Sequence, residues 1–275
     1  MSFMKKNSLF LYICVISSTL LISGCDDKKK PDEKISEKSS QQLATTVINS
    51  YLFHTEPELL PNSKLIKQQK ITGASSNKVI NYNAQGYVAN YDLDGLYGEV
   101  NYDTAKYIYG NNREQYDIIF DAQKNILGMK NNDGDIVENS EFDEQGHLVE
   151  TTLSHFAENN VIFNNKIIYE NDHVELILYN AYVPVDEKTK FPILAQEKEI
   201  IYNENNQIEK TILKTYKLTS NGEIIINNKN EQEVELTETC TYTNYNENQD
   251  WTKAVCVKTG VESETVELTR TIEYQ

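Results

Sequence analysis

A short motif recurs along most of this chain and constrains its fold more than any other feature. Its clearest copy lies in Ser140–Glu150, where Phe142 is followed by Asp143, two polar residues, Gly146 and then Leu148. Asp favours the first position of a tight turn, and Gly accepts the positive φ that closes such a turn. Apolar residues flank the turn on both sides. The motif therefore predicts a β-hairpin with a loop of four or five residues.

Related copies of the motif follow one another along the chain. They are Tyr82–Val88, Phe120–Ile126, Tyr202–Ile208 and Tyr245–Trp251, with a shortened relative at Tyr169–Val174. Lys124 and Asn206 stand at the glycine position in two of these copies, and Asn tolerates that conformation better than most residues. Asp133-Gly134 and Asn221-Gly222 are separate hairpin-turn signals. The chain is thus predicted to fold as hairpins in tandem.

The C-terminal strands show which side chains they bury. In the last one, apolar residues alternate with Thr and Glu, the apolar set being Val266, Leu268, Ile272 and Tyr274. A period of two indicates one buried and one wet face. The predicted fold is all-β, an antiparallel meander of repeated β-hairpins that forms a twisted or curled sheet. Its buried face must pack on a helix, on a second layer or on its own curled end, and the sequence leaves these three open.

Local sequence signals predict the structure of two further segments. Leu43, Val47 and Tyr51 fall four apart, which predicts one short N-terminal amphipathic helix over about residues 40–53. The segment Asn180–Gln196 holds Pro184 and Pro192, and we expect it to be one long irregular connection.

The aromatic-Asp-x-x-Gly pattern resembles the YD repeats of Rhs-type proteins. The resemblance covers roughly Tyr82 to the C-terminus and is degenerate. In large members of that family, tandem hairpins line up into a strip that coils into a shell. For a chain of this length the resemblance implies the antiparallel meander and not the encapsulation.

The N-terminus carries an export signal. Lys5 and Lys6 precede an apolar run, Leu9–Ile22, which ends in Ser23-Gly24-Cys25. This stretch resembles the lipobox of bacterial lipoproteins, which implies lipidation of Cys25 and anchoring in a membrane. In the enteric sorting scheme, Asp26 favours the inner membrane. The predicted organisation is a signal peptide over 1–24, the lipidated Cys and a disordered tether over 25–42, and a single β-rich domain over 43–275.

The body keeps one pair of cysteines, because Cys14 leaves with the signal peptide and Cys25 carries lipid. In an oxidising compartment Cys240 and Cys256 are expected to form a disulfide. If the hairpin turn is centred on Asn248, residues equally distant from it face each other, which places the two cysteines opposite one another. The same register pairs Tyr245 with Trp251, Tyr242 with Ala254 and Glu238 with Lys258.

Charge argues against nucleic acid as a partner. The net charge is −16, and removal of residues 1–24, whose only charges are Lys5 and Lys6, brings it to −18. Such a protein repels phosphate backbones, and no basic stripe offsets the repulsion.

No catalytic, cofactor or metal motif is recognisable. The histidines show no metal-ligand spacing, these being His54, His147, His155 and His173. Asp92–Gly95 and Asp133–Asp135 place carboxylates on tight turns, where turn chemistry competes with weak calcium binding. No cofactor is expected. The sequence leaves open whether two carboxylates form a pair suited to glycoside hydrolysis, because such pairs meet in space and not in sequence.

These features favour a non-enzymatic, lipid-anchored envelope protein that faces the periplasm and uses a sheet surface to engage another envelope component. The alternative is a small-ligand or glycan-binding lipoprotein with a tyrosine-lined sheet face, since the chain contains 18 tyrosines. An enzyme and a protector against a secreted toxin are the remaining classes. A convergent polar pocket would favour ligand binding, whereas an exposed apolar patch would favour a protein partner.

The anchor is testable at one residue. Cys25→Ser should abolish lipid attachment, because the thiol is the acylated group. Metabolic labelling with palmitate should mark the wild type but not the variant, and Cys14→Ser should label as the wild type does. Equal incorporation into Cys25→Ser and the wild type would contradict the lipobox interpretation.

Overall fold

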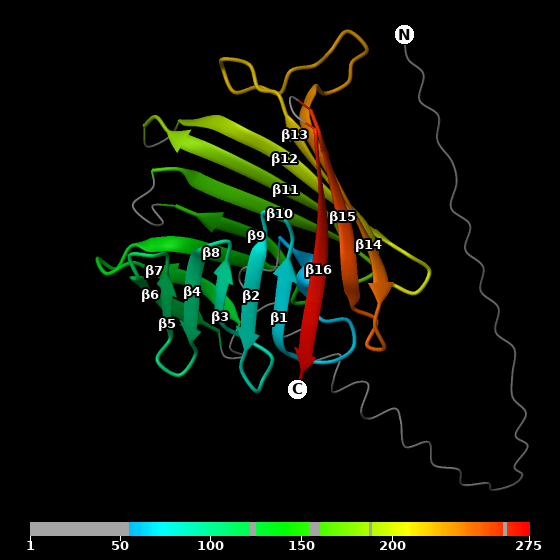
Figure 1. Cartoon of the computed structure of the whole chain (residues 1–275). Helices are drawn as coiled ribbons and strands as arrows, with labels where there is room; N and C mark the ends of the chain where they lie inside the picture. Colours follow the sequence, from blue (N-terminus) through cyan, green and yellow to red (C-terminus); the bar gives the residue numbers. More distant parts are fainter. Residues whose placement is uncertain (1–54, 122–124, 155–159, 187–188, 261–262) are drawn as a thin grey trace, which may run out of the picture.

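The computed structural model describes residues 55–121, 125–154, 160–186, 189–260 and 263–275. Within these residues the chain forms sixteen strands, and each pairs antiparallel with the next along the sequence. The first strand also pairs with the last, so the meander closes into a barrel (Figure 1). No helix of this described part is long and apolar enough to cross a membrane.

The elements are the 3-10 turn η1 (Pro57–Leu59), β1 (Ile66–Thr72), β2 (Asn77–Tyr82), β3 (Val88–Leu93), β4 (Leu96–Asn101), β5 (Lys106–Tyr109), β6 (Glu114–Phe120), β7 (Ile126–Lys130), β8 (Ile136–Phe142), β9 (Leu148–Leu153), β10 (Ile162–Glu170), β11 (His173–Pro184), β12 (Lys190–Tyr202), β13 (Ile208–Tyr216), β14 (Val234–Tyr245), β15 (Trp251–Thr259) and β16 (Glu264–Tyr274).

The predicted all-β meander of antiparallel hairpins is confirmed. The sheet is closed, however, and not an open twisted or curled sheet, because β1 and β16 pair over six residues of β1, from Ile66 to Thr72 with Lys67 in a bulge. Closure buries the apolar face against itself and leaves no free sheet edge. The helix predicted over residues 40–53 lies outside the described residues.

Four of the motif copies close their hairpins with the same contacts. In the first copy, the amide of Asn83 donates to the carbonyl of Tyr87 and the amide of Gly86 donates to the carbonyl of Asn83. The Asn83 side-chain Oδ1 accepts the amides of Gln85 and Tyr87. Equivalent bonds recur at Asp143, Asn203 and Asn246. The Asx side chain therefore replaces the partners that the tightly turned backbone cannot supply.

In five of the copies the aromatic residue sits directly after a shift in strand register, whereas Tyr245 continues the regular register of its hairpin. Such shifts precede Tyr82, Phe120, Phe142, Tyr169 and Tyr202. A bulge re-aims the next side chain, and these rings pack against the buried clusters of the barrel. The motif aromatics thus line the inside of the barrel at one end.

Several of these motif tyrosines donate a hydrogen bond to the neighbouring hairpin. Tyr169 donates its hydroxyl to the carbonyl of Leu148 at 3.1 Å, Tyr202 to Val174 at 3.2 Å and Tyr245 to Ile208 at 2.8 Å. Each acceptor is the apolar residue that follows the preceding turn. Tyr102 makes the same bond to Val88, at 3.0 Å, although its turn is capped by Asn101, which precedes the tyrosine, and not by a residue that follows it.

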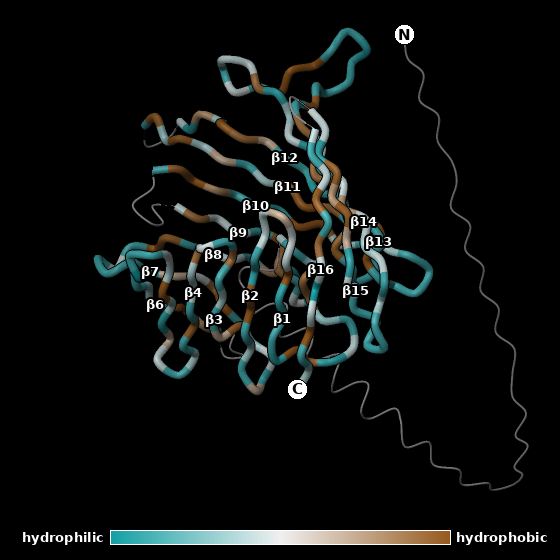
Figure 2. The backbone as a smooth tube through the Cα atoms, in the orientation of Figure 1, coloured by the Kyte–Doolittle hydropathy of each residue, from teal (hydrophilic) through white to brown (hydrophobic). Residues whose placement is uncertain are grey.

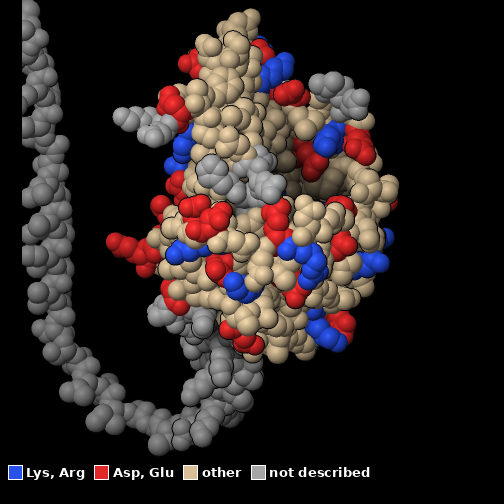
Figure 3. Space-filling model, turned by 90° about the vertical axis from the view of Figure 1, so that its left-hand side faces the viewer, with Lys and Arg blue, Asp and Glu red and all other residues tan. Residues whose placement is uncertain are grey.

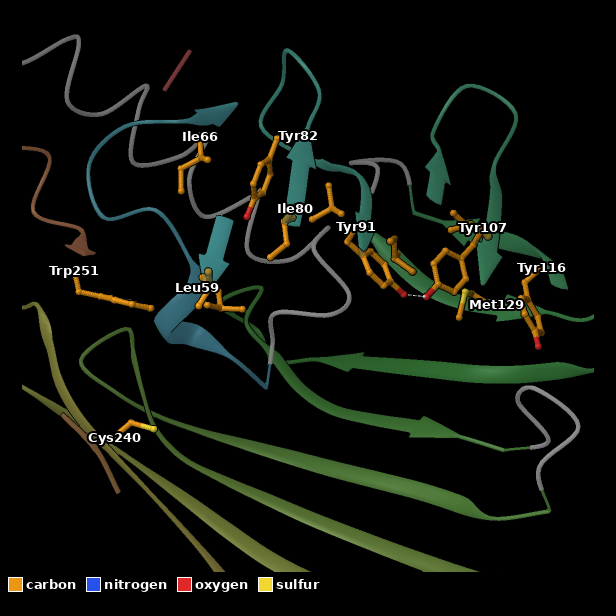
Figure 4. Close-up of a cluster of buried hydrophobic side chains, with 14 of the residues drawn as sticks. Leu59, Ile66, Ile80, Tyr82, Tyr91, Tyr107, Tyr116, Met129, Cys240 and Trp251 are labelled. Atoms are coloured by element: carbon orange, nitrogen blue, oxygen red, sulfur yellow. Dashed lines mark hydrogen bonds between the residues drawn. The ribbon is translucent and has the colours of Figure 1, made fainter. Parts of the chain in front are cut away.

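The alternation predicted for the last strand is present. Hydrophilic and hydrophobic residues also alternate along other strands (Figure 2). In β16 the apolar row is shielded, whereas Thr265, Glu267 and Glu273 are exposed. On the side of the short strands, rings and aliphatic chains fill the interior (Figure 4). There the hydroxyls of Tyr91 and Tyr107 bond at 2.5 Å.

The prediction of an irregular connection over Asn180–Gln196 is wrong. β11 continues to Pro184 and β12 begins at Lys190. Pro192 pairs with Tyr182 beside a register shift, where the missing amide of proline is tolerated. The irregular connection lies instead over residues 217–233, where two tight turns occupy 219–223 and 227–231.

The hairpin of β14 and β15 has the predicted register. Tyr245 pairs with Trp251, Tyr242 with Ala254 and Glu238 with Lys258. Cys240 lies opposite Cys256, and the two form the predicted disulfide.

The turn of this hairpin offers a stability test. Gln249 has a φ of 66° at the position where other copies carry glycine. Gln249→Gly should raise the free energy of unfolding by about 0.5–1 kcal/mol, because the relief of left-handed strain exceeds the added freedom of the unfolded chain. The melting temperature should rise by about 2–4 °C.

The matched control is Gly146→Ala, at the same position of another copy. A methyl group there meets no atom within 4 Å, so only the strain at its φ of 87° remains. This variant should lose about 1 kcal/mol. A lower melting temperature for Gln249→Gly would refute the assigned turn geometry.

Candidate functional site

The segment that precedes β1 runs through the inside of the barrel. We call residues 55–65 the strap; it contains η1 and contacts the inner faces of β11, β12, β15 and β16. In Figure 4 Leu59 lies on this segment, between Trp251 and the strands of the apolar core. Leu59 is 4% exposed. The strap is therefore part of the interior of the barrel.

A buried arginine on β16 holds the strap. Arg270 is 2% exposed, and its Nη2 donates to the carbonyl of Leu59 at 3.0 Å and its Nη1 to that of Glu58 at 3.4 Å. Its Nε donates to Oε1 of Gln69 at 2.7 Å, and Gln69 in turn donates to the Leu59 carbonyl. Carbonyls at the end of a helical turn lack partners within that turn and favour a cation. Burial lowers the pKa of Arg270, and the charge of Asp250 opposes this shift.

Trp251 completes this clamp. Its indole Nε1 donates to the carbonyl of Glu58 at 2.7 Å. The guanidinium of Arg270 lies 5.0 Å from the centroid of the indole ring, which is a cation–π distance. Trp251 itself is 4% exposed. The indole thus reports directly on whether the strap is in place.

The two ends of the strap are fixed separately. At its beginning, Thr55 accepts bonds on its carbonyl from Tyr179 at 2.8 Å and from Lys198 at 3.1 Å. At its end, Asn62 bonds to Oδ1 of Asp250 and to the carbonyl of Gln249, in the β14–β15 turn. The strap therefore bridges the wall formed by β11 and β12 to the motif turn of another hairpin.

Two cavities lie beside the strap. The rim cavity, of about 420 Å³, is bordered by motif turns and by residues that include Tyr169, His173, Tyr202 and Asn206. The strap cavity, of about 310 Å³, is bordered by the strap, by β1 and β2, and by the strands from β11 to β16. Glu58 and Trp251 border both. Figure 3 shows a deep hollow on one face of the molecule, with charged side chains at its edge.

The strap cavity gathers ionisable groups. Its lining includes Glu56, Glu58 and Glu238 together with Lys78 and Lys198. Lys198 Nζ lies 2.6 Å from Oε1 of Glu58, and both side chains are nearly buried, at 10% and 12% exposure. Lys78 is farther from its partner, with Nζ 4.0 Å from Oε1 of Glu56. Oε2 of Glu58 is buried and has no hydrogen-bond partner among the described residues.

Burial and the lining carboxylates shift the pKa of two groups at the cavity. Burial raises the pKa of Tyr242 well above its ordinary range, and the charges of Glu58, Glu56 and Glu238 add to the shift. Burial likewise raises the pKa of Glu56, where Lys78 opposes the shift and Glu58 adds to it. Glu56 and Glu58 therefore repel each other, and the lysines beside them offset part of this repulsion.

The remaining wall of the strap cavity is apolar and rigid. Tyr242 lies 5.0 Å from the Trp251 ring centroid, and its hydroxyl bonds to Oγ1 of Thr211 at 3.1 Å. The Cys240–Cys256 disulfide lines the cavity and links the two strands behind these residues. An apolar wall with convergent polar groups is the usual construction of a small-molecule site.

The residues singled out from the sequence have mixed positions. Cys240 and Cys256 meet in this wall, whereas Cys25, His54 and His155 lie outside the described residues. His147 bonds to Asp143 at 3.0 Å and stacks on Tyr169, and His173 packs on Tyr202. The described residues contain no group of three or more His, Cys, Asp or Glu side chains arranged to hold a metal.

The acidic turns examined for calcium are explained by turn bonds. Oδ1 of Asp92 accepts the amide of Gly95, and Oδ1 of Asp94 accepts that of Asn77. At the second turn, Oδ1 of Asn131 accepts the amides of Asp133 and Asp135.

No sequence motif marks Glu58, Lys198, Trp251 and Arg270 as parts of a site. A signal for Arg270 existed, because it occupies an inward position between Leu268 and Ile272 in an otherwise apolar row. A charge in such a row requires partners inside the barrel.

Comparisons with known proteins give structural likenesses but no family. The sequence matches no family model and no curated protein. Among solved structures, the chain is similar to a porin-like protein from Bacteroides uniformis ATCC 8492, at 12% identity and a TM-score of 0.36, over 76% of this chain and 98% of that one.

The clamp can be tested by replacing its cation. Arg270→Met keeps much of the volume but leaves the carbonyls of Glu58 and Leu59 short of donors, so stability should fall by about 2–4 kcal/mol. The sequence contains one tryptophan, Trp251, and its fluorescence should shift to longer wavelength as the strap loosens.

Arg113→Met is the control, because that side chain is 57% exposed and pairs with Glu99 on the surface. It should change stability by less than about 0.5 kcal/mol and leave the emission unchanged. Unchanged emission and stability in Arg270→Met would show that the strap does not depend on this residue.

Proposed function

We propose that this chain is an exported, lipid-anchored binding protein of the bacterial cell envelope, without enzymatic activity, that holds a small ligand in the strap cavity. The lipobox at Ile22–Cys25 supports export and anchoring. The strap cavity supports binding. The tether over residues 25–42 gives the barrel reach from the membrane.

The observation that carries this proposal is the convergence of polar groups on one cavity with an apolar wall. A volume of about 310 Å³ is at the small end of the range for ligand pockets, so the ligand is small. Its wall is supplied by elements distant in sequence, which the disulfide and the Lys198–Glu58 pair hold in place. Such a preorganised site loses little entropy when a ligand binds.

The sequence suggested a tyrosine-lined sheet face as the alternative binding surface, and several tyrosines do border the cavities of the barrel. Tyr179 and Tyr242 border the strap cavity, and Tyr169 and Tyr202 border the rim cavity. The ligand-binding alternative therefore keeps its aromatic platform, on the inner face of a barrel. Glycans remain one ligand class that aromatic rings and amides suit.

A pair of neighbouring substitutions tests binding in the cavity. Leu213 lines the strap cavity, and Ile212, next to it in β13, belongs to the opposite face of the strand. The full-length protein in neutral detergent is screened against a library of soluble small molecules by thermal shift. Ligands should raise the melting temperature of the wild type and of Ile212→Trp, and not that of Leu213→Trp, in which the indole fills the cavity.

Equal shifts in both variants would place binding elsewhere, and no shift with any compound in the wild type would refute the proposal. In the second case an envelope protein partner becomes the leading candidate. A specific observation favours it, namely exposed apolar side chains near the start of β10, of β12 and of β14: Phe163, Val185, Phe191, Ile193, Ile226 and Val234.

A further inference from the structure

We infer that the ligand of the strap cavity is a small organic cation, an amine with an apolar body, whose ammonium group sits among the carboxylates of Glu56, Glu58 and Glu238. This inference rests on the proposed function and names the ligand class of the same site. Four properties of the cavity lead to it.

The first property is the pairing of the charges around the lining. Lys198 bonds to Oε1 of Glu58, and Lys78 lies at the limit of an ion pair with Glu56. Glu238 pairs with Lys258, whose Nζ lies 3.7 Å from its Oε2. An anionic ligand would therefore have to displace a carboxylate from its lysine, whereas an ammonium group can share the carboxylate oxygens.

The second property is an unused acceptor. Oε2 of Glu58 is buried without a hydrogen-bond partner among the described residues, which is unfavourable in an empty site. The strap positions this group through three independent bonds, from Arg270 and Trp251 to the Glu58 carbonyl and from Lys198 to Oε1. An ammonium group offers three donors and no acceptor, which matches carboxylates that need donors.

The third property is the surface available to the rest of the ligand. Tyr242 and Tyr179 present rings, and Leu213, Leu268 and the disulfide complete an apolar wall. The rings and the carboxylates border the same cavity, so a cation beside a ring face is stabilised by both. An alkyl or aryl body fits against this wall.

The fourth property is the field of the whole chain. A net charge of −16 attracts cations and repels anions over distances beyond the cavity. Long-range and local electrostatics thus select the same sign of ligand.

Three probes that share one body separate these effects. 2-Phenylethylamine, 2-phenylethanol and phenylacetate carry an ammonium, a hydroxyl and a carboxylate on a similar aromatic body. Binding to the full-length protein in neutral detergent is measured by isothermal titration calorimetry at pH 7. The amine should bind at least about tenfold more tightly than the alcohol, and phenylacetate should not bind.

Glu58→Gln keeps the shape of the side chain and removes its charge. It should weaken the amine at least about tenfold and leave the alcohol unchanged. Glu247→Gln, on an exposed turn, makes the same change in net charge and should have no effect, which separates the site from the long-range field. Since Glu58→Gln also alters the Lys198 pair, Trp251 emission checks that the strap is in place. Glu238→Gln, on the opposite wall, repeats the test without touching the strap.

Equal or tighter binding of the alcohol or phenylacetate would overturn the cation inference and leave the proposed function standing. Amine binding that survives both Glu58→Gln and Glu238→Gln would also overturn it. The proposed function itself fails on a different result: no compound of the library raises the melting temperature of the wild type.

Discussion

The interior of this barrel is arranged around one buried cation. A guanidinium inside a protein is stable only where acceptors surround it. The strands next to Arg270 supply Gln69, and the remaining acceptors come from the strap, as the carbonyls of Glu58 and Leu59. Arg270 thereby fixes a segment about 200 residues away in the sequence inside the lumen. The same contacts bring Glu56 and Glu58 to the cavity, so the site depends on the clamp.

Closure of the sheet has a separate and more local origin. A single hairpin of the repeat cannot bury its own aromatic residue. The bulge before that residue turns the ring inward, and its hydroxyl reaches the carbonyl that the preceding turn leaves free, as between Tyr202 and Val174. Each hairpin is therefore completed by its neighbour. A chain of such hairpins has unsatisfied ends until β1 meets β16, which favours a closed ring over an open strip.

The fold could be predicted as far as its contacts are local. Turn chemistry located most hairpins, and the turn centred on Asn248 set the register that brings Cys240 to Cys256. Pro184 and Pro192 led to the wrong prediction of an irregular connection, because a strand with a bulge accommodates a proline that a regular strand would not. The strap could not be predicted, since most of its hydrogen-bond partners lie 124 to 212 residues away and its own sequence carries no periodic signal. For the cavity, the one signal in the sequence is the charged Arg270 in an apolar row, which indicates polar partners inside the barrel.

The two sides of the barrel differ in strand length and in the residues of their inner faces. The strands from β1 to β8 are four to seven residues long, and their interior is filled by groups such as Tyr91, Tyr107 and Met129. From β10 to β16 the strands have nine to thirteen residues, and their inner face carries Lys198 and Glu238. Stability does not explain these charges, because a buried ion pair can often be replaced by apolar residues without loss. Their concentration beside a cavity is instead what recognition of a charged ligand requires, and the apolar side provides the core that supports it.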